Sequence, residues 1–220
     1  MDYKKIFVHF MVRSGALTFG EFTLKSGRKS PYFINTGKYN TAAQISALGD
    51  FYAACINGNI PPEEYDMLYG PAYKGIPLVV SGASALFRNY NIDKPFAFNR
   101  KEAKDHGEGG LLVGYAPKNG DRVLIIEDVM TSGRSIRESF PILKAAADIK
   151  LKYELISVDR MERGTGGKSA VQEIEDEFGL KVFSIVNILD VIKYLHNQPV
   201  DGTVYIDDKI KSRIESGLAY

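Results

Sequence analysis

Two adjacent acidic residues, Glu127 and Asp128, directly follow the continuous apolar segment at residues 123–126. A short stretch rich in small and hydroxyl-bearing side chains comes next, and a predicted helix begins at Ser135. The free backbone N–H groups and the dipole at a helix start bind anions such as phosphate. Because two carboxylates would repel a phosphate, we expect them to bind sugar hydroxyl groups or a divalent cation beside it. The alternative for the acidic pair alone is a strand end followed by an ordinary capped helix.

A second group of chemically active side chains lies at residues 100–110, directly after a predicted strand. It contains three cations and a histidine, namely Arg100, Lys101, Lys104 and His106. The segment is charged, lacks large apolar residues and ends in glycines, so we predict a mobile surface loop. A cationic loop at this place suits a lid that closes over pyrophosphate. The alternative is a solvated loop that binds nothing.

The acidic pair and the residues after it resemble the phosphoribosyl-pyrophosphate (PRPP) motif of the type I phosphoribosyltransferases. The resemblance implies that Glu127 and Asp128 hold the ribose hydroxyl groups, and that Asp128 is a catalytic residue. It also implies that the 5′-phosphate is surrounded by Thr131, Ser132, Gly133, Arg134 and Ser135. Val129 and Met130 are implied to contact PRPP as well. Arg134 stands where the family often has threonine or another small residue, so a hydroxyl contact is absent there.

The spacing Arg-x-x-x-Lys-x-His in the cationic segment resembles the catalytic loop of the orotate phosphoribosyltransferases, which reaches into the neighbouring subunit's site. The resemblance implies that the pyrophosphate oxygens are bound by Arg100, Lys101, Lys104 and His106. Lys104 is implied to be catalytic, because it stabilises charge on the leaving group. A homodimer with a shared active-site loop is implied in the same way.

Residues 22–33 resemble the N-terminal hood of the same family. There, Lys25 is implied to meet both PRPP and orotate, and Phe33 and Ile34 to lie against the pyrimidine. The family often has a second aromatic residue where Ile34 stands. Taken without the resemblance, the Ser-Gly-Arg stretch inside this segment is only a turn.

Two further segments resemble that family. Residues 70–77 follow a predicted strand and resemble its pyrophosphate loop, with Tyr73 and Lys74 as ligands. Arg160 matches the residue that holds the orotate carboxylate, an anion that a planar guanidinium group suits well. Thr131 is implied to contact orotate in addition to the phosphate.

The elements that must position these residues alternate along the chain. Strands are predicted at residues 66–69, 95–99, 123–126, 153–158 and 181–186, and helices at residues 2–15, 41–58, 75–88, 135–147, 169–178 and 207–216. This alternation predicts an α/β fold with a mainly parallel sheet flanked by helices, as the resemblance implies. Residues 1–40 are expected to form a small α+β hood, within one domain that spans residues 1–220. Ligands of such sheets bind beyond the carboxyl ends of the strands.

The composition is that of an ordinary globular protein. The 220 residues are 45% hydrophobic and 25% charged, with a formal net charge of +1, which excludes a disordered chain and gives no sign of nucleic-acid or membrane binding. No apolar run reaches the ~18 residues of a spanning helix, and the N-terminus does not resemble a signal peptide. The single cysteine, Cys55, is expected in the core. We therefore expect a cytoplasmic protein.

Together these resemblances imply the activity of an orotate phosphoribosyltransferase, a pentosyltransferase that converts orotate and PRPP to orotidine 5′-monophosphate and pyrophosphate. Mg²⁺ is the expected cofactor, held mainly through PRPP rather than by a metal site of the protein. One alternative is a phosphoribosyltransferase for a purine or another base. The other is a PRPP-sensing regulator that binds nucleic acid, which the small net charge disfavours.

Overall fold

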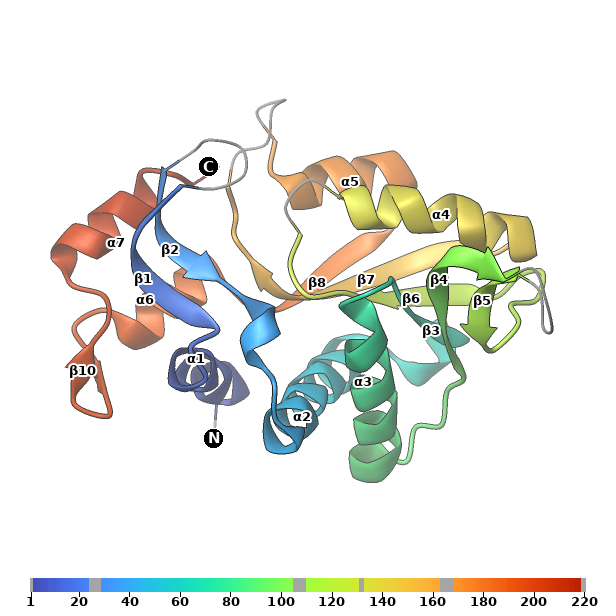
Figure 1. Cartoon of the computed structure of the whole chain (residues 1–220), viewed down its shortest axis with the longest axis horizontal. Helices are drawn as coiled ribbons and strands as arrows, with labels where there is room; N and C mark the ends of the chain where they lie inside the picture. Colours follow the sequence, from blue (N-terminus) through green and yellow to red (C-terminus); the bar gives the residue numbers. More distant parts are fainter. Residues whose placement is uncertain (1, 24–28, 105–109, 131–132, 163–167, 219–220) are drawn as a thin grey trace.

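A six-stranded β-sheet forms the centre of the computed structural model, which describes residues 2–23, 29–104, 110–130, 133–162 and 168–218 (Figure 1). Its strands are Met67–Gly70 (β3), Phe96–Lys104 (β4), Gly110–Gly114 (β5), Arg122–Ile126 (β6), Lys150–Asp159 (β7) and Lys181–Asn187 (β8). They lie in the order β5-β4-β3-β6-β7-β8, and of the neighbouring pairs β4–β5 is antiparallel while the others are parallel. The predicted α/β fold with a mainly parallel sheet is confirmed.

Helices cover both faces of this sheet (Figure 1). One face carries Ala42–Asn59 (α2) and Gly75–Tyr90 (α3), and the other carries Arg134–Ala146 (α4) and Ala170–Phe178 (α5). Side chains alternate across a strand, so Ile126 packs into the core on the α2 and α3 side whereas Ile125 packs into the core under α4 and α5. Burial on both faces explains why β6 is a continuous apolar run.

The N-terminal hood consists of Tyr3–Arg13 (α1), Leu17–Thr23 (β1) and Lys29–Ile34 (β2), with β1 and β2 paired antiparallel. Asp2 caps α1, and Gly15 follows the helix at a φ of +69°, which favours glycine. A 3-10 turn, Thr36–Lys38 (η1), then leads to α2. A capping box of Thr41 and Gln44 starts α2.

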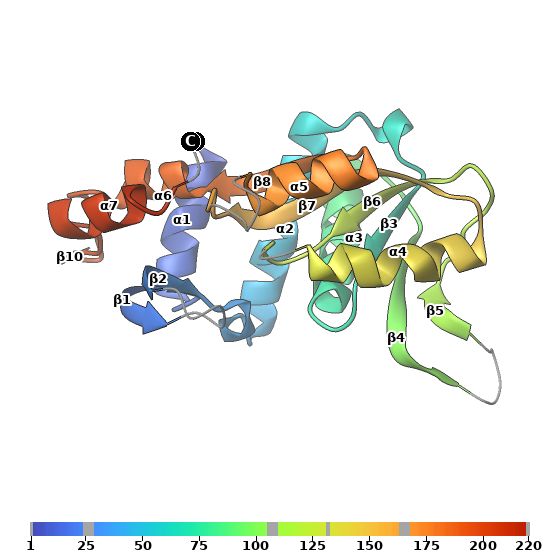
Figure 2. The ribbon, with the colours of Figure 1, turned by 90° about the horizontal axis from the view of Figure 1, so that it is seen from above.

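The C-terminal segment folds against the hood (Figure 2). Its elements are Ile188–Leu195 (α6), Pro199–Val200 (β9), Thr203–Val204 (β10) and Asp208–Glu215 (α7). The sequence predicts α7 but neither α6 nor the small β9–β10 pair. α6 packs on α1, and α7 packs on β2. Leu218 forms an isolated antiparallel bridge with Glu162, so the end of the chain reaches the loop after β7.

The largest difference from the sequence prediction concerns residues 100–110. The strand predicted to end at Asn99 continues to Lys104, which pairs with Gly110 at the start of β5. β4 and β5 form a ribbon that extends from the edge of the sheet (Figure 2). Residues 100–104 and 110 are therefore strand rather than the predicted loop, and residues 105–109 lie outside the described part of the chain.

Smaller sequence predictions also have outcomes in the structure. Cys55 is buried within α2, as expected. Pro141 lies inside α4, which runs to Ala146, and Gly58 lies within the last turn of α2 rather than ending the helix. A 3-10 turn, Pro62–Glu64 (η2), precedes β3. None of the helices in the described part of the chain has the length and apolar character needed to cross a membrane.

Candidate active site

Asp128 lies just beyond the carboxyl end of β6 and is buried, with 5% of its surface exposed. Its Oδ2 accepts hydrogen bonds from Thr36 Oγ1 at 2.7 Å and from Lys74 Nζ at 2.8 Å. Its backbone carbonyl accepts from the N–H of Ser157 at 2.8 Å and from the hydroxyl of Ser157 at 2.5 Å. The carboxylate is therefore held by η1 and by the loop before α3, while β7 holds the backbone of Asp128.

Glu127 is fixed differently from its neighbour. Its backbone carbonyl accepts a 2.5 Å hydrogen bond from the hydroxyl of Tyr52 in α2. Burial raises the pKa of its carboxyl to about 7, and the Asp128 charge adds to the rise, while a hydrogen bond from Ser135 and the Lys74 charge oppose it. Glu127 therefore changes its protonation state near neutral pH and can either accept from or donate to a hydroxyl group.

The segment after the acidic pair forms a turn into α4. Val129 pairs with β7 through an isolated bridge, and the side chain of Met130 is buried, so these two residues offer mainly their backbone to a ligand. Gly133 has a φ of +64°, and a Cβ there would lie 2.2 Å from Ile174 of α5, so only glycine fits. Arg134 begins α4 with its side chain exposed and bonded to Glu138, Nε to Oε1, at 2.5 Å. Thr131 and Ser132 lie outside the described residues.

The loop between β3 and α3 carries Tyr73 and Lys74. Both side chains are largely exposed, Tyr73 at 67% of the residue surface and Lys74 at 62% of the side chain even though it contacts Asp128. Asn99 of β4 holds this loop in place. Its Oδ1 accepts hydrogen bonds from the Ala72 N–H at 2.8 Å and from the Tyr69 hydroxyl at 2.9 Å. Asn99 thus ties the position of this loop to β4.

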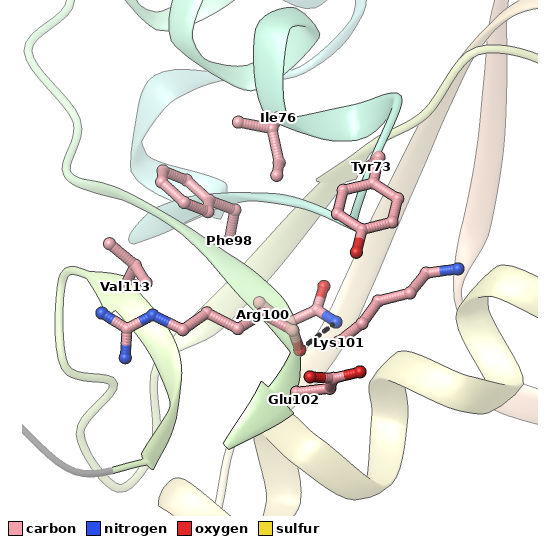
Figure 3. A pocket seen from close by; sticks show the side chains of 8 residues that line it. Tyr73, Ile76, Phe98, Arg100, Lys101, Glu102 and Val113 are labelled. Carbon is pink, nitrogen blue, oxygen red and sulfur yellow. Dashed lines mark hydrogen bonds between the residues drawn. The ribbon is translucent and has the colours of Figure 1, made fainter. Parts of the chain in front are cut away.

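A cavity of about 450 Å³ lies between this loop and the β4–β5 ribbon (Figure 3). Lys101 extends along the Tyr73 side, with its Nζ 5.0 Å from the centre of the Tyr73 ring. Arg100, the preceding residue on the strand, extends the opposite way toward Val113, as strand alternation requires (Figure 3). Lys104 is the last residue of β4, with a side chain outside the described part, as His106 is.

A smaller cavity of about 250 Å³ lies on the other side of Lys74, between η1 and the start of α3. Thr36, Lys74 and Asp128 line it together, and so does Tyr73, which borders both cavities. The two cavities therefore meet at the loop of Tyr73 and Lys74. Polar groups converge there beside apolar walls, which is the usual character of a small-molecule site.

Arg160 follows β7 and is 7% exposed. Its guanidinium group makes two hydrogen bonds to Glu162, Nε to Oε2 at 2.9 Å and Nη2 to Oε1 at 2.8 Å. It also lies 4.6 Å from the centre of the Tyr32 ring. A buried cation held this way suits a flat anionic ligand.

The hood residues divide between two faces of β2. Phe33 is 39% exposed and stacks on Phe22, with ring centres 5.5 Å apart. Ile34 points the other way and belongs to the hydrophobic core. Of the pair predicted to lie against the pyrimidine, only Phe33 presents its side chain on the exposed face. Lys25 lies outside the described residues.

Several residues of this site escape the sequence patterns. Thr36, Tyr52 and Ser157 hold the acidic pair, Asn99 holds the Tyr73 loop, and Glu162 holds Arg160. Each belongs to a different segment, and only Glu162, two positions after Arg160, lies beside a residue that the sequence singles out. Within the described part of the chain, no three His, Cys, Asp or Glu side chains come together as a metal site.

Comparisons with known proteins agree over most of the chain. Residues 35–167 match the phosphoribosyl transferase domain family. The chain is 52% identical over 213 residues to the orotate phosphoribosyltransferase of Clostridium beijerinckii, covering 97% of this chain and 95% of that protein. It is 50% identical over 198 residues to that of Salmonella agona, covering 90% of each. The crystal structure of the Francisella tularensis orotate phosphoribosyltransferase is similar with a TM-score of 0.80 and 38% identity, covering 96% of each chain.

Proposed function

The chain belongs to the orotate phosphoribosyltransferase family, and we propose that it performs the family's reaction with the residues described above. In that reaction the 5-phosphoribosyl group of PRPP passes to orotate, giving orotidine 5′-monophosphate and pyrophosphate for pyrimidine biosynthesis. The observation that carries the proposal is the meeting of Asp128 with Lys74 and Thr36 in the wall of the smaller cavity, which shares Tyr73 with the larger one. The relatives named above are all orotate phosphoribosyltransferases, which favours this reaction over the purine-base and regulator alternatives.

We assign the substrate contacts as follows. Glu127 and Asp128 hold the ribose hydroxyl groups, and residues 131–135 surround the 5′-phosphate with backbone N–H groups. Tyr73, Lys74 and the cationic residues of the ribbon bind the pyrophosphate. When pyrophosphate leaves C1, positive charge develops on the ribose ring, so the site works mainly by positioning and electrostatic stabilisation. Closure of residues 100–110 over the substrate excludes water, which would hydrolyse PRPP.

Mg²⁺ is the proposed cofactor, held mainly by PRPP oxygens. The acidic pair could supply one or two carboxylate oxygens to such an ion, and Mg²⁺ bound to phosphates needs few protein ligands. When bound, the ion neutralises part of the pyrophosphate charge. The chain's own cations, Lys74 and Lys101, carry out the rest of that neutralisation from the protein side.

A spectrophotometric assay of the wild-type protein tests this function. With PRPP and Mg²⁺, we expect orotate to be consumed. Uracil and hypoxanthine should react more slowly by a factor of about 100 or more. The reason is that the buried Arg160 fork suits an anionic group on the base, and a base without a carboxylate forgoes those charge-assisted hydrogen bonds. Equal or faster use of hypoxanthine would instead support the purine alternative.

We propose further that two copies of the chain form a homodimer. Large apolar side chains are exposed along α3 and the loop before it, namely Tyr73, Val80, Phe87 and Tyr90. Exposed apolar groups gathered on one helix mark an interaction surface, and a second copy is the simplest partner for it. The ribbon that carries Lys101 and Lys104 lies next to the same loop (Figure 3).

Subunit mixing tests whether the ribbon tip acts in the neighbouring site. Lys104→Ala and Asp128→Asn chains with different tags are co-expressed, and hybrid dimers are isolated by two affinity steps. If Lys104 serves the partner's site, each hybrid retains one intact site and about half of the wild-type turnover. Hybrids as inactive as the two parents would show that Lys104 serves its own chain. A monomer on size-exclusion chromatography would overturn the dimer itself.

We also propose that residues 1–220 form one domain and act in the cytoplasm. One hydrophobic core contains Phe7 of α1, Tyr32 of the hood and Leu124 of the sheet, which supports folding as one unit. The substrates, PRPP and orotate, are charged small metabolites, which supports a cytoplasmic place of action. Neither nucleic acid nor a membrane is needed by the proposed reaction.

A further inference from the structure

The guanidinium group of Arg160 is engaged along one edge only. Nε and Nη2 point at Glu162, with distances of 2.9 and 2.8 Å to the two carboxylate oxygens. Nη2 has a further long contact of 3.5 Å with Ser30 Oγ. An arginine carries five N–H donors in a planar fork, and the bonds to Glu162 and Ser30 use only Nε and Nη2. The Nη1 end is thus the end of the fork that Glu162 does not occupy.

Tyr32 holds this ion pair from a second direction. Its ring lies against the guanidinium plane, 4.6 Å from centre to Cζ, and its hydroxyl donates a 3.1 Å hydrogen bond to Glu162 Oε1. Stacking and hydrogen bonding together restrict both the plane and the rotation of the Arg160 fork. One tyrosine therefore contacts both members of the pair.

The backbone of Glu162 is also anchored. Glu162 bridges Leu218 near the end of the chain, and α7, just before Leu218, packs on β2. The Glu162 side chain is 17% exposed, and that of Arg160 is 8% exposed. In such a partly dehydrated place a charge-assisted, two-bond contact has well-defined geometry. The C-terminal segment thereby helps to fix the position of Glu162, and through Glu162 that of Arg160.

We propose that Glu162 is a positioning residue, which holds Arg160 by its Nε and Nη2 edge so that the Nη1 end faces the carboxylate of the base. This inference rests on the proposed function, in which Arg160 binds that carboxylate. The competing arrangement is that Glu162 occupies the edge the substrate needs and must be displaced. The two arrangements predict opposite effects of removing the Glu162 charge.

The test is Glu162→Gln, compared with Glu177→Gln as a matched control. Glu177 forms an exposed pair with Arg137 on the α4 and α5 side, and its variant should behave as wild type. For Glu162→Gln we expect the KM for orotate to rise about tenfold. The KM for PRPP and kcat at saturating orotate should change by no more than about twofold, since a positioning role affects only the base.

Tyr32→Phe provides a second, milder variant. It keeps the ring against the guanidinium group and removes only the hydroxyl bond to Glu162, so we expect the KM for orotate to rise about threefold. This variant decides the question if Glu162→Gln does not fold, which a thermal melt of each protein will show. An orotate KM that stays at the wild-type value or falls in the folded variants would overturn the proposal. Failure of the wild type to consume orotate would instead overturn the proposed function.

Discussion

The Asp128→Asn enzyme is expected to lose about 10²- to 10³-fold in kcat/KM for PRPP. Asparagine keeps the shape of the side chain and can still accept from Thr36, but it removes the negative charge that faces Lys74 and, in the proposed complex, the ribose. Because positive charge grows on the ribose ring as pyrophosphate leaves, a missing carboxylate there costs more in the transition state than in the ground state. Initial rates of orotate consumption at varied PRPP measure the loss.

Thr36→Val is the matched control for Asp128→Asn. It deletes one of the two side-chain hydrogen bonds to Asp128 Oδ2 and leaves the charge in place, so we expect about a five- to tenfold loss. A small loss from Thr36→Val beside a large one from Asp128→Asn would assign the effect to charge rather than to side-chain placement. An Asp128→Asn enzyme with a tenth or more of wild-type activity would contradict the role of Asp128.

The parts of the site that the sequence predicts are those encoded contiguously. Glu127 and Asp128 are visible because an apolar strand, an acidic pair and a helix start follow one another within a few residues, and the structure has β6 and α4 at those positions. Tyr73 and Lys74 are visible for the same reason, since they follow β3 and precede α3. A strand end that runs into a helix is a local pattern, so one sequence suffices to find it.

The supporting contacts could not be predicted because they join distant segments. Thr36 and Asp128 are 92 positions apart, and Tyr32 and Glu162 are 130 positions apart. A threonine after a short strand and a glutamate in a polar loop are common features with no particular role. Only the packing of the hood on the sheet brings Thr36 to Asp128 and Tyr32 to Glu162. The roles of Thr36 and Glu162 therefore depend on tertiary structure.

The β4–β5 ribbon escaped prediction for a different reason. A strand is recognised in a sequence when apolar and polar residues alternate. The ribbon extends away from the core, so neither of its faces needs apolar residues. Arg100, Lys101 and Glu102 are all charged and therefore show no such alternation. The pairing of Lys104 with Gly110 is set by the partner strand, which no pattern within residues 100–104 specifies. β propensity depends on such neighbours more than helix propensity does.

Glu154 is a buried acid whose substitution should stabilise the protein strongly at alkaline pH. It lies on β7 between Ile125 and Val182 of the neighbouring strands and is 1% exposed. Both carboxyl oxygens lack a hydrogen-bond partner within the described part of the chain. Burial raises the pKa of Glu154 from 4.5 to about 8, and the charge of Glu127 adds to the rise. The folded protein therefore keeps this carboxyl protonated at neutral pH.

The sign of the pH dependence follows from that shift. Below pH 4.5 the carboxyl is neutral in both the folded and the unfolded chain, so its stability contribution is fully present. As the pH rises from about 4.5 to about 8, only the unfolded chain ionises, and stability falls by about 1.4 kcal/mol per pH unit. Above about pH 8 both states are ionised, and the loss is complete.

Two variants separate ionisation from packing at Glu154. Glu154→Gln cannot ionise but keeps a buried polar group, whereas Glu154→Met removes both the charge and the polarity. Relative to either variant, we expect the free energy of unfolding of the wild type to fall by about 2–4 kcal/mol between pH 5 and pH 8. Urea unfolding at matched protein concentration measures this, since association affects the apparent stability. Parallel pH profiles for all three proteins would mean that Glu154 ionises normally in the fold, through a partner such as bound water.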